Sequence, residues 1–216
     1  MIKVEHIKTF NWEGAIRGMR NPLNSHDNSD SEFSLEGNSK TKKFETVVRI
    51  GDNDLALMRK LVKAGSDHRK FLRQILVSVD ITAPLYWWKE FDTYKVGTVA
   101  NSCSTMHTIH KRELTMEDFS CEHLMTKEKQ MMKMIINLLN EDIMVYNADT
   151  NQKAFWWQII QLLPSSFNQK RTVTLNYEVL LNMYHARRNH RLDEWKHFCG
   201  EIEKMPYAKE LICDVD

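Results

Sequence analysis

The chain has 216 residues, 42% of them hydrophobic, and this composition is sufficient to bury a sizeable core, which excludes an intrinsically disordered protein. Its 30 Lys and Arg residues balance its 29 Asp and Glu residues, so there is no excess of positive charge to attract a phosphate backbone. We expect neither a nucleic acid nor a membrane as partner, because the start lacks the apolar stretch of a signal peptide and no run of about 18 apolar residues occurs.

The N-terminal part predicts two strands separated by a helix and a long polar segment. Residues 2–7 alternate apolar and polar side chains, which is typical of a strand, and residues 12–19 are helical up to Asn21-Pro22. Residues 21–43 are rich in Ser, Asn, Asp and Lys and lack periodicity. We expect them to be an insertion-like loop that is mobile or acts as a lid. Residues 45–50 again predict a strand.

The middle of the chain predicts a helix, a strand and a short aromatic helix. Residues 51–54 cap a helix with apolar residues at helical spacing, and Gly65 to Asp67 ends it and begins the next one. Residues 75–81 alternate as in a strand, and Pro84 opens the aromatic helix.

The C-terminal part predicts mainly helices. Thr126 caps a long helix to Tyr146, whose inward side we expect to consist of Met131, Met134, Ile135, Leu138, Leu139 and Ile143. The methionines of the chain are expected to be mostly core residues. Further along, the pattern predicts a helix over residues 152–163, a strand over residues 171–175 and helices over residues 177–211 with breaks near Asn189 and Pro206. A few short strands mixed with long helices, without parallel βαβ alternation, favour the α+β class.

The four cysteines are scattered with no Cys-x-x-Cys spacing: Cys103, Cys121, Cys199 and Cys213. In a chain of this length, such spacing indicates free thiols in a reducing compartment. We therefore expect a soluble, cytoplasmic protein.

The heptad Asn101 to His107 follows the aromatic and acidic run Trp87 to Lys95 and concentrates hydroxyls, a thiol, an amide and an imidazole. It is suited to contact a polar ligand, and it can equally be a polar turn between two elements. A hydrolase site built from Ser104 and His107 is not indicated, because no Gly-x-Ser-x-Gly sequence flanks them.

The predicted helix after residue 176 carries polar residues on an apolar side. Asn176, Leu180, Met183, Tyr184 and Arg187 are spaced so that they share one side of the helix. An inward arginine must find an anion, because a buried unpaired charge costs several kcal/mol. Arg187 therefore either pairs with Glu194 or Asp193, or binds a phosphate or the edge of a pyrimidine.

Other candidate sites are weaker. His107, His110, Cys121 and His123 lack the paired, tightly spaced ligands of structural zinc, so we expect no metal. Neither Gly-x-Gly-x-x-Gly nor Gly-x-x-x-x-Gly-Lys-Ser/Thr occurs, which argues against a Rossmann dinucleotide site and a P-loop.

Two further groups have both a structural and a functional interpretation. The pairs Trp87-Trp88 and Trp156-Trp157 could stack on a flat ring, but aromatic pairs at helical spacing are more often core residues. Arg17 and Arg20, near the long loop, are either surface arginines or close on a phosphate.

The heptad and the C-terminal residues together resemble the flavin-dependent thymidylate synthase (ThyX) family. The signature of that family is Arg-His-Arg, a short spacer, Ser and then Asn-Glu-x-Ser-x-Arg-Tyr, and Asn101 to His107 is similar to its second half in register. The C-terminal pattern of the family is Leu-Pro, then Thr-x-Asn and a helix ending in a nucleotide-binding arginine. It resembles Leu163-Pro164, Thr174 to Asn176, and Arg187.

The resemblance covers about residues 60 to 200, and within it His68 is similar to the flavin-side histidine of the family. It implies a single ThyX-like domain over residues 1–216 in which a short mixed or antiparallel sheet packs with long helices. It also implies a homotetramer with active sites at subunit interfaces. The implied reaction methylates dUMP to dTMP with methylenetetrahydrofolate and NADPH through FAD, with no protein nucleophile.

The same resemblance assigns roles to individual residues. Ser104 is the implied catalytic residue and contacts the uracil of the substrate, and Arg187 binds the nucleotide. The implied flavin-binding residues are His68, Lys95, Asn101 and Asn176.

The chain lacks several of the charged residues of the family signature. Tyr94-Lys95-Val96 stands in place of Arg-His-Arg, and Ser102, Met106 and His107 stand in place of Glu, Arg and Tyr. A cation lost from a dry phosphate site costs a few kcal/mol, so Lys95, or Arg17 and Arg20, would have to substitute. The alternative is a protein of the same fold that binds a nucleotide or a partner without catalysis.

Overall fold

The computed structural model describes residues 2–38 and 43–215, which form two compact units. Unit 1 consists of Met1–His6, Val79–Lys95 and Ala100–Val173. Unit 2 consists of Ile7–Ser78, Val96–Val99 and Thr174–Asp216. Each unit therefore combines segments that are far apart in the sequence.

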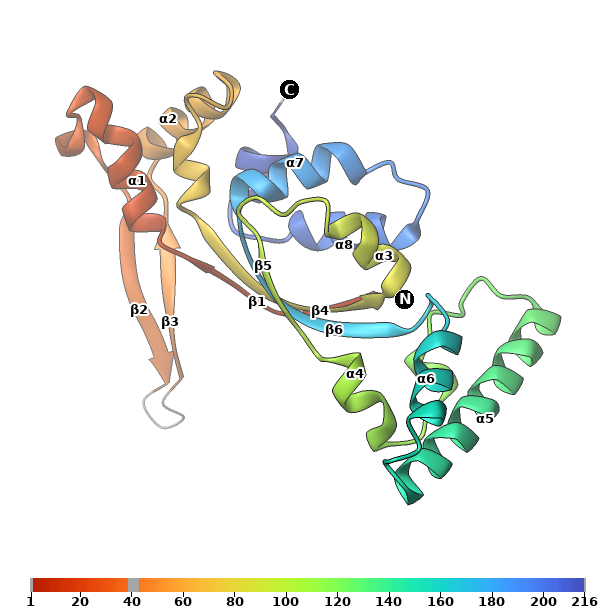
Figure 1. Ribbon diagram of the computed structural model, residues 1–216. Coiled ribbons are helices and arrows are strands. Elements are labelled where there is room, and N and C mark those ends of the chain that lie inside the picture. Colours follow the sequence, from red (N-terminus) through yellow and green to blue (C-terminus); the bar gives the residue numbers. More distant parts are fainter. Residues whose placement is uncertain (1, 39–42, 216) are drawn as a thin grey trace. The chain divides into compact units, whose positions relative to one another are not determined.

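The described residues contain two sheets (Figure 1). The larger has the strand order β1-β4-β6-β5, and its strands are β1 (Lys3–Phe10), β4 (Leu76–Pro84), β6 (Asn168–Asn176) and β5 (Val99–Ser102). The smaller pairs β2 (Glu32–Asn38) with β3 (Lys43–Arg49) in antiparallel orientation. The alternation that predicted β4 is confirmed, because Val77, Val79 and Ile81 are all buried. Short sheets combined with long helices confirm the predicted α+β class.

Unit 1 contains the helices α3 (Leu85–Phe91), α4 (Thr105–Thr108), α5 (Thr126–Ala148) and α6 (Lys153–Leu162), with short 3-10 turns η4 (Ile109–Lys111) and η5 (Met116–Asp118). Helices α5 and α6 lie side by side (Figure 1). One core cluster comprises Ile109, Leu114, Phe119, Met132, Ile136, Leu139, Ile143 and Ile159. Trp87 and Trp88 of α3 are also buried, which confirms the structural interpretation of this aromatic pair.

The predicted inward side of α5 is wrong in part. Leu139 and Ile143 are buried as expected, but Met131, Met134 and Leu138 are exposed. Helix α5 carries apolar residues on more than one side, so helical spacing alone does not identify the side that packs against the core.

Unit 2 contains α1 (Trp12–Arg20), α2 (Asp52–Lys63), α7 (Tyr177–Arg187) and α8 (Asp193–Ile202), with shorter turns η1 (Asn21–Leu23), η2 (His26–Asn28), η3 (Lys70–Arg73) and the π-helical η6 (Lys209–Cys213). Its core includes the edge-on contact of Trp12 with Tyr177, whose ring centroids are 5.1 Å apart. The Tyr177 hydroxyl donates a hydrogen bond of 2.7 Å to the carbonyl of Pro206. The predicted helices on both sides of Asn189 are confirmed.

Residues 21–43, which we expected to be an insertion-like loop, contain η1, η2, β2 and the start of β3. Residues 39–42 of that prediction lie outside the described residues. No helix of the described part is long and apolar enough to cross a membrane.

The buried carboxylate of Asp54 holds this segment in place. It accepts hydrogen bonds from the Ser29 hydroxyl at 2.8 Å and from the Ser31 hydroxyl at 2.6 Å. It also accepts from the backbone amides of Asp30 and Ser31, and from Arg20 Nε at 2.6 Å. Burial raises the pKa of Asp54, but the hydrogen bonds from Ser31, Ser29 and Arg20 outweigh burial and hold this pKa below its usual value.

Candidate functional site

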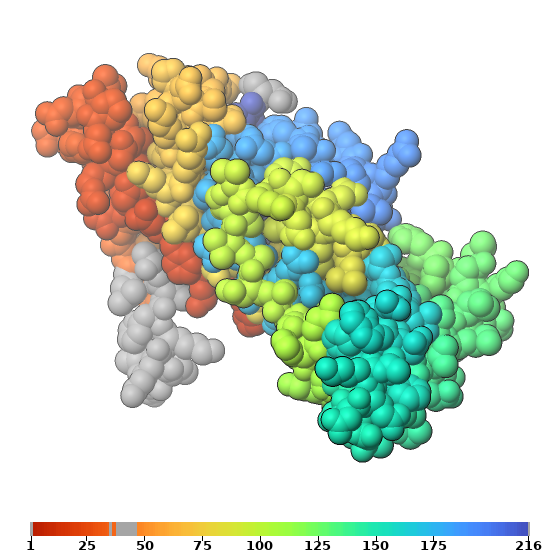
Figure 2. Space-filling view, in the orientation of Figure 1, coloured from red at the N-terminus to blue at the C-terminus, as the bar shows by residue number. Residues whose placement is uncertain are grey.

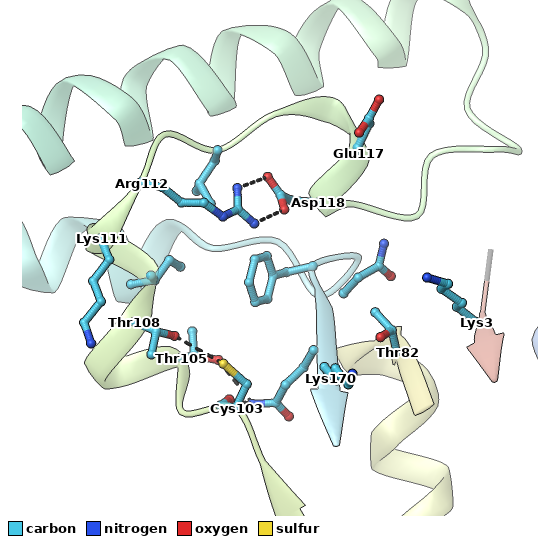
Figure 3. Close-up of a pocket in the computed structure, with 15 residues that line it drawn as sticks. Lys3, Thr82, Cys103, Thr105, Thr108, Lys111, Arg112, Glu117, Asp118 and Lys170 are labelled. Carbon is cyan, nitrogen blue, oxygen red and sulfur yellow. Dashed lines mark hydrogen bonds and ion pairs between the residues drawn. The ribbon is translucent and has the colours of Figure 1, made fainter. Parts of the chain in front are cut away.

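A cavity of about 600 Å³ opens in unit 1 beside the polar heptad (Figure 3). It is lined by Lys3, Thr82, Cys103, Thr105, Thr108, Ile109, Lys111, Arg112, Leu114, Glu117, Asp118, Phe167, Asn168, Gln169 and Lys170. These residues come from β1, β4, β6, the residue before β6 and the chain between β5 and α5. Hydroxyls, a thiol, an amide and ammonium groups therefore face one space of the size that small-molecule ligands occupy.

The heptad forms the end of β5 and the start of α4. The Cys103 amide donates a hydrogen bond of 2.9 Å to the carbonyl of Lys170, which fixes the heptad to β6. The Thr108 hydroxyl donates to the Ser104 carbonyl at 2.7 Å and lies 3.6 Å from Cys103 Sγ. These bonds hold Cys103, Thr105 and Thr108 toward the cavity, as Figure 3 shows.

Gln169 of β6 connects the heptad to α3. Its Nε2 lies 3.2 Å from both the Cys103 carbonyl and the Thr105 hydroxyl. Its Oε1 accepts a hydrogen bond of 2.9 Å from Arg171 Nε, and Arg171 Nη1 lies 2.7 Å from a carboxylate oxygen of Asp92. The Arg171 guanidinium lies 4.1 Å from the ring centroid of Trp88, so a stacked cation supports the network. Sequence reasoning missed Gln169 and Arg171.

Three of the four cations that line the cavity already have anionic partners. Lys3 lies 2.8 Å from Glu5, Lys170 lies 2.9 Å from Asp80, and Arg112 pairs with Asp118 through both terminal nitrogens. The hydrogen bond with Asp80 raises the pKa of Lys170.

The fourth cation, Lys111, is exposed and makes no ion pair with any residue in the described ranges 2–38 and 43–215. In the view of Figure 3, Lys111 and Lys3 lie on opposite sides of the cavity. Lys111 is therefore the cation that an anionic ligand would engage without first breaking an ion pair.

The sequence-predicted residues of unit 1 lie near this cavity or on the chain leading to it. Ser104 is half-buried between Cys103 and Thr105, which both line the cavity. Asn101 is exposed on β5, and Lys95 is exposed in the segment that follows α3.

The remaining predicted residues belong to unit 2. His68 is exposed between α2 and η3. Asn176 is buried at the N-terminus of α7, where its Oδ1 accepts a hydrogen bond of 3.0 Å from the amide of Val179. Arg187 is half-buried at the other end of α7, about 16 Å away along the helix axis, and its guanidinium lies 5.0 Å from the ring centroid of Trp195. Leu180, Met183 and Tyr184 are buried between them, as the spacing predicted.

Two arginines near the start of α7 were not predicted from the sequence. Buried Glu178 pairs with Arg69 at 3.2 Å and also with Arg73. Burial raises the pKa of Glu178, but Arg73 and Arg69 outweigh burial and hold it below its usual value.

Arg20 does not substitute for a missing phosphate-binding arginine. It is buried, its Nε lies 2.6 Å from Asp54, and its Nη1 donates to the Ser25 carbonyl at 3.1 Å. Within the part of the chain that the structure describes, no group of three or more His, Cys, Asp and Glu residues could hold a metal ion.

No model of a known protein family matches the sequence, and a comparison with curated proteins finds no match. Solved structures do match. A structure of ThyX from Helicobacter pylori with FAD and dUMP has a TM-score of 0.66 and 14% identity, covering 99% of this chain and 97% of that chain. A second, ThyX from Helicobacter pylori complexed with FAD and dUMP, has a TM-score of 0.65 and 14% identity, covering 99% and 98%.

A structure of the UMP/dUMP methylase PolB from Streptomyces cacaoi bound with 5-Br dUMP is also similar. Its TM-score is 0.56 at 13% identity, covering 94% of this chain and 88% of that chain. At such identities the likeness concerns the fold and not the activity. The predicted resemblance is confirmed at that level: the chain has the fold of the flavin-dependent thymidylate synthase ThyX.

Proposed function

We propose that this chain binds a pyrimidine nucleotide such as dUMP in the cavity of unit 1 and methylates it to dTMP, with FAD as cofactor. The observation that supports the proposal is that Cys103 and Thr105 of the ThyX-like heptad line a cavity in a chain whose fold matches ThyX over 99% of its length. Methylenetetrahydrofolate and NADPH as further reactants, a tetramer and a cytoplasmic location remain predictions.

The chemistry of the cavity suits a nucleotide. A phosphate needs a cation with free donors, and Lys111 provides an ammonium group with no anionic partner among the described residues. A pyrimidine edge needs donors and acceptors in fixed positions, and the Thr105 hydroxyl is fixed by Gln169. Ser104, for which the resemblance implies a role beside the uracil, lies in the chain between the lining residues Cys103 and Thr105.

FAD is the cofactor that the resemblance implies, and two unit 1 residues fit it. Lys95 and Asn101 are exposed, and neither side chain hydrogen-bonds to another residue within the described ranges. An ammonium group suits a flavin phosphate and a carboxamide suits a ring edge. When bound, FAD would supply the redox chemistry of methyl transfer, while the protein binds and orients the reactants.

We also propose roles for three residues of unit 2: His68 and Asn176 in binding flavin, and Arg187 in binding the nucleotide. His68 is exposed and accessible to a ligand. Asn176 already uses Oδ1 to cap α7, so only its Nδ2 would be available to a flavin. Arg187 remains a second candidate for the nucleotide phosphate.

A nucleotide-binding protein without catalysis is the competing function. Val96 supports it, because this side chain is 91% exposed and uncharged where the signature has arginine. The two functions differ in one property, since only the catalyst needs flavin.

Two measurements on the purified full-length protein test the proposal. Titration with FAD should change the flavin absorption or fluorescence, and product analysis should then show dTMP. Calorimetry should show dUMP binding that Lys111→Ala weakens about 10- to 100-fold, as expected for a lost charge-assisted hydrogen bond. Lys153→Ala is the control, since Lys153 is exposed in unit 1 and does not line the cavity.

The outcomes separate the alternatives. Binding of dUMP without any flavin binding would support the non-catalytic function. If Arg187→Ala weakens dUMP binding and Lys111→Ala does not, Arg187 binds the phosphate and Lys111 does not. No binding of dUMP with or without FAD would contradict both functions.

A further inference from the structure

A short segment of unit 1 carries Lys111 between two open spaces. It consists of η4 and the three residues that follow it, and we call residues 109–114 the strap. Lys111 and Arg112 line the cavity of the proposed site, whereas Arg112 and Glu113 line a second cavity of about 620 Å³ beside α5. The middle of the strap therefore borders two open spaces, so packing alone does not fix the position of Lys111.

The two ends of the strap are anchored on α5. Ile109 and Leu114 are buried and belong to the core cluster that includes Ile143 of α5. The Asn140 carboxamide binds both backbone groups of Leu114, because its Oδ1 accepts from the amide at 2.8 Å and its Nδ2 donates to the carbonyl at 3.0 Å. The end of the strap is thus held as it would be by a neighbouring strand.

A second carboxamide of α5 acts directly beside Lys111. Asn147 Nδ2 donates a hydrogen bond of 2.8 Å to the carbonyl of His110. This carbonyl and the Cα of Lys111 belong to one planar peptide group, so the bond fixes the point from which the lysine side chain leaves the backbone. On the other side, Arg112 is held by Asp118 through both terminal nitrogens. Both neighbours of Lys111 are therefore held in place.

The Asn147 bond contributes to position more than to folding. It is exposed, and α5 lies at the surface of unit 1, in the green to teal segment of Figure 2. An exposed hydrogen bond exchanges readily with water, so its loss costs the fold little. Without it, residues 110 and 111 would sample further conformations while the buried ends keep the strap attached.

We propose that Asn147, together with Asn140, is a positioning residue that holds Lys111 at the cavity for an anionic ligand. The inference rests on the proposed function of the cavity and extends the site to the polar side of α5. If the peptide group before Lys111 is free, ligand binding has to order it. Ordering one residue weakens binding about 10-fold.

Calorimetry with dUMP on the full-length protein tests the inference. Asn147→Ala should weaken dUMP binding about 10-fold. Asn137→Ala is the matched control and should bind dUMP as the wild type does. Asn137 is exposed on α5 and lines the second cavity, but its side chain makes no hydrogen bond with residues 2–38 or 43–215.

A double-mutant cycle separates positioning from stability. Asn147→Ala added to Lys111→Ala should weaken dUMP binding no further, because both changes remove the same ligand contact. A residue that only stabilises the fold would weaken binding equally in both backgrounds. The melting temperature of Asn147→Ala should lie within about 2 °C of the wild type.

Three results would overturn the inference while leaving the proposed function in place. These are Asn147→Ala binding dUMP as tightly as the wild type, an equal loss of affinity in both backgrounds, and normal dUMP binding by Lys111→Ala. Failure of the proposed function has a different signature, because the wild-type protein itself would then bind no dUMP, and the inference would fail with it.

Discussion

The cavity of unit 1 and helix α7 of unit 2 both collect polar side chains, but these side chains have different partners. At α7 they are satisfied within the protein: Asn176 caps the helix, Glu178 pairs with Arg69 and Arg73, and the Tyr184 hydroxyl lies 2.8 Å from Glu203. At the cavity, Lys111 has no anionic partner among the residues that the structure describes.

The difference shows how to separate structural from functional polar residues. A buried polar group must be hydrogen-bonded, so a satisfied group such as Glu178 is accounted for by the stability of the fold. A donor that faces a cavity without a partner is not explained by the stability of the fold. Such a donor is a better candidate for a ligand contact. The following variants test this division.

The largest effect is expected at Arg20. Arg20→Ala leaves the buried carboxylate of Asp54 without its cation and should lower the free energy of unfolding by about 3–5 kcal/mol. Arg17→Ala is the control, because Arg17 is exposed in the same helix and its loss should change stability by less than about 0.5 kcal/mol. Urea denaturation measures both. Equal stabilities would show that Asp54 does not depend on Arg20.

The pH dependence of stability should also involve Asp54. Its pKa is lower in the folded protein than in the unfolded chain, so the folded state binds fewer protons. The resulting stability is present above about pH 4, the range of an unfolded aspartate, and is lost as pH falls through the folded pKa. Asp54→Asn should be less stable at neutral pH and lose less stability on acidification. An unchanged acid profile would mean that Asp54 does not titrate in this range.

At the cavity, Gln169→Ala should act on binding more than on folding. It removes the hydrogen bonds to the Cys103 carbonyl and the Thr105 hydroxyl, and dUMP binding should weaken by about 1–2 kcal/mol. The melting temperature should change little, because the hydrogen bond from Gln169 to the Cys103 carbonyl is exposed and water can replace it. Gln158→Ala, an exposed residue of α6, is the control. A variant that binds dUMP normally but melts early would make Gln169 a structural residue.

The smallest effect is expected at Asn176. Asn176→Ala removes the cap of α7 and should cost about 1 kcal/mol of stability, whereas Asn176→Asp should retain the cap. If Asn176 also binds flavin through Nδ2, Asn176→Asp would weaken FAD binding while stability stays normal. Fluorescence titration with FAD beside thermal melting distinguishes the two roles.

Much of the secondary structure was predictable from local patterns. The alternation in β4 and the Asn21-Pro22 end of α1 depend on residues that are close in sequence. The side of α5 that packs inward was not predictable, because Met131 and Met132 are equally apolar and only tertiary contacts distinguish them. The elements before Asp54 were not predictable for a similar reason, since their order depends on hydrogen bonds across 23 to 34 residues.

The candidate site was predictable only at the heptad. A concentration of small polar residues marked Asn101 to His107, and part of it lines the cavity. Gln169 gave no signal because its contacts with Cys103 and Thr105 span 64 to 66 residues. Lys111 gave none either, since an unpaired lysine is recognisable only when its surroundings are known. The prediction of a single domain remains a prediction.

Photo-cross-linking with 5-bromo-dUMP, followed by mass mapping of the labelled peptides, tests the central claim most directly. The account predicts that the label lies within residues 103–118 or 167–170, the two segments that contain most of the cavity lining, and that excess dUMP prevents labelling. Label confined to other peptides, such as those of α7, or label that dUMP does not displace, would contradict the assignment of the cavity as the nucleotide site.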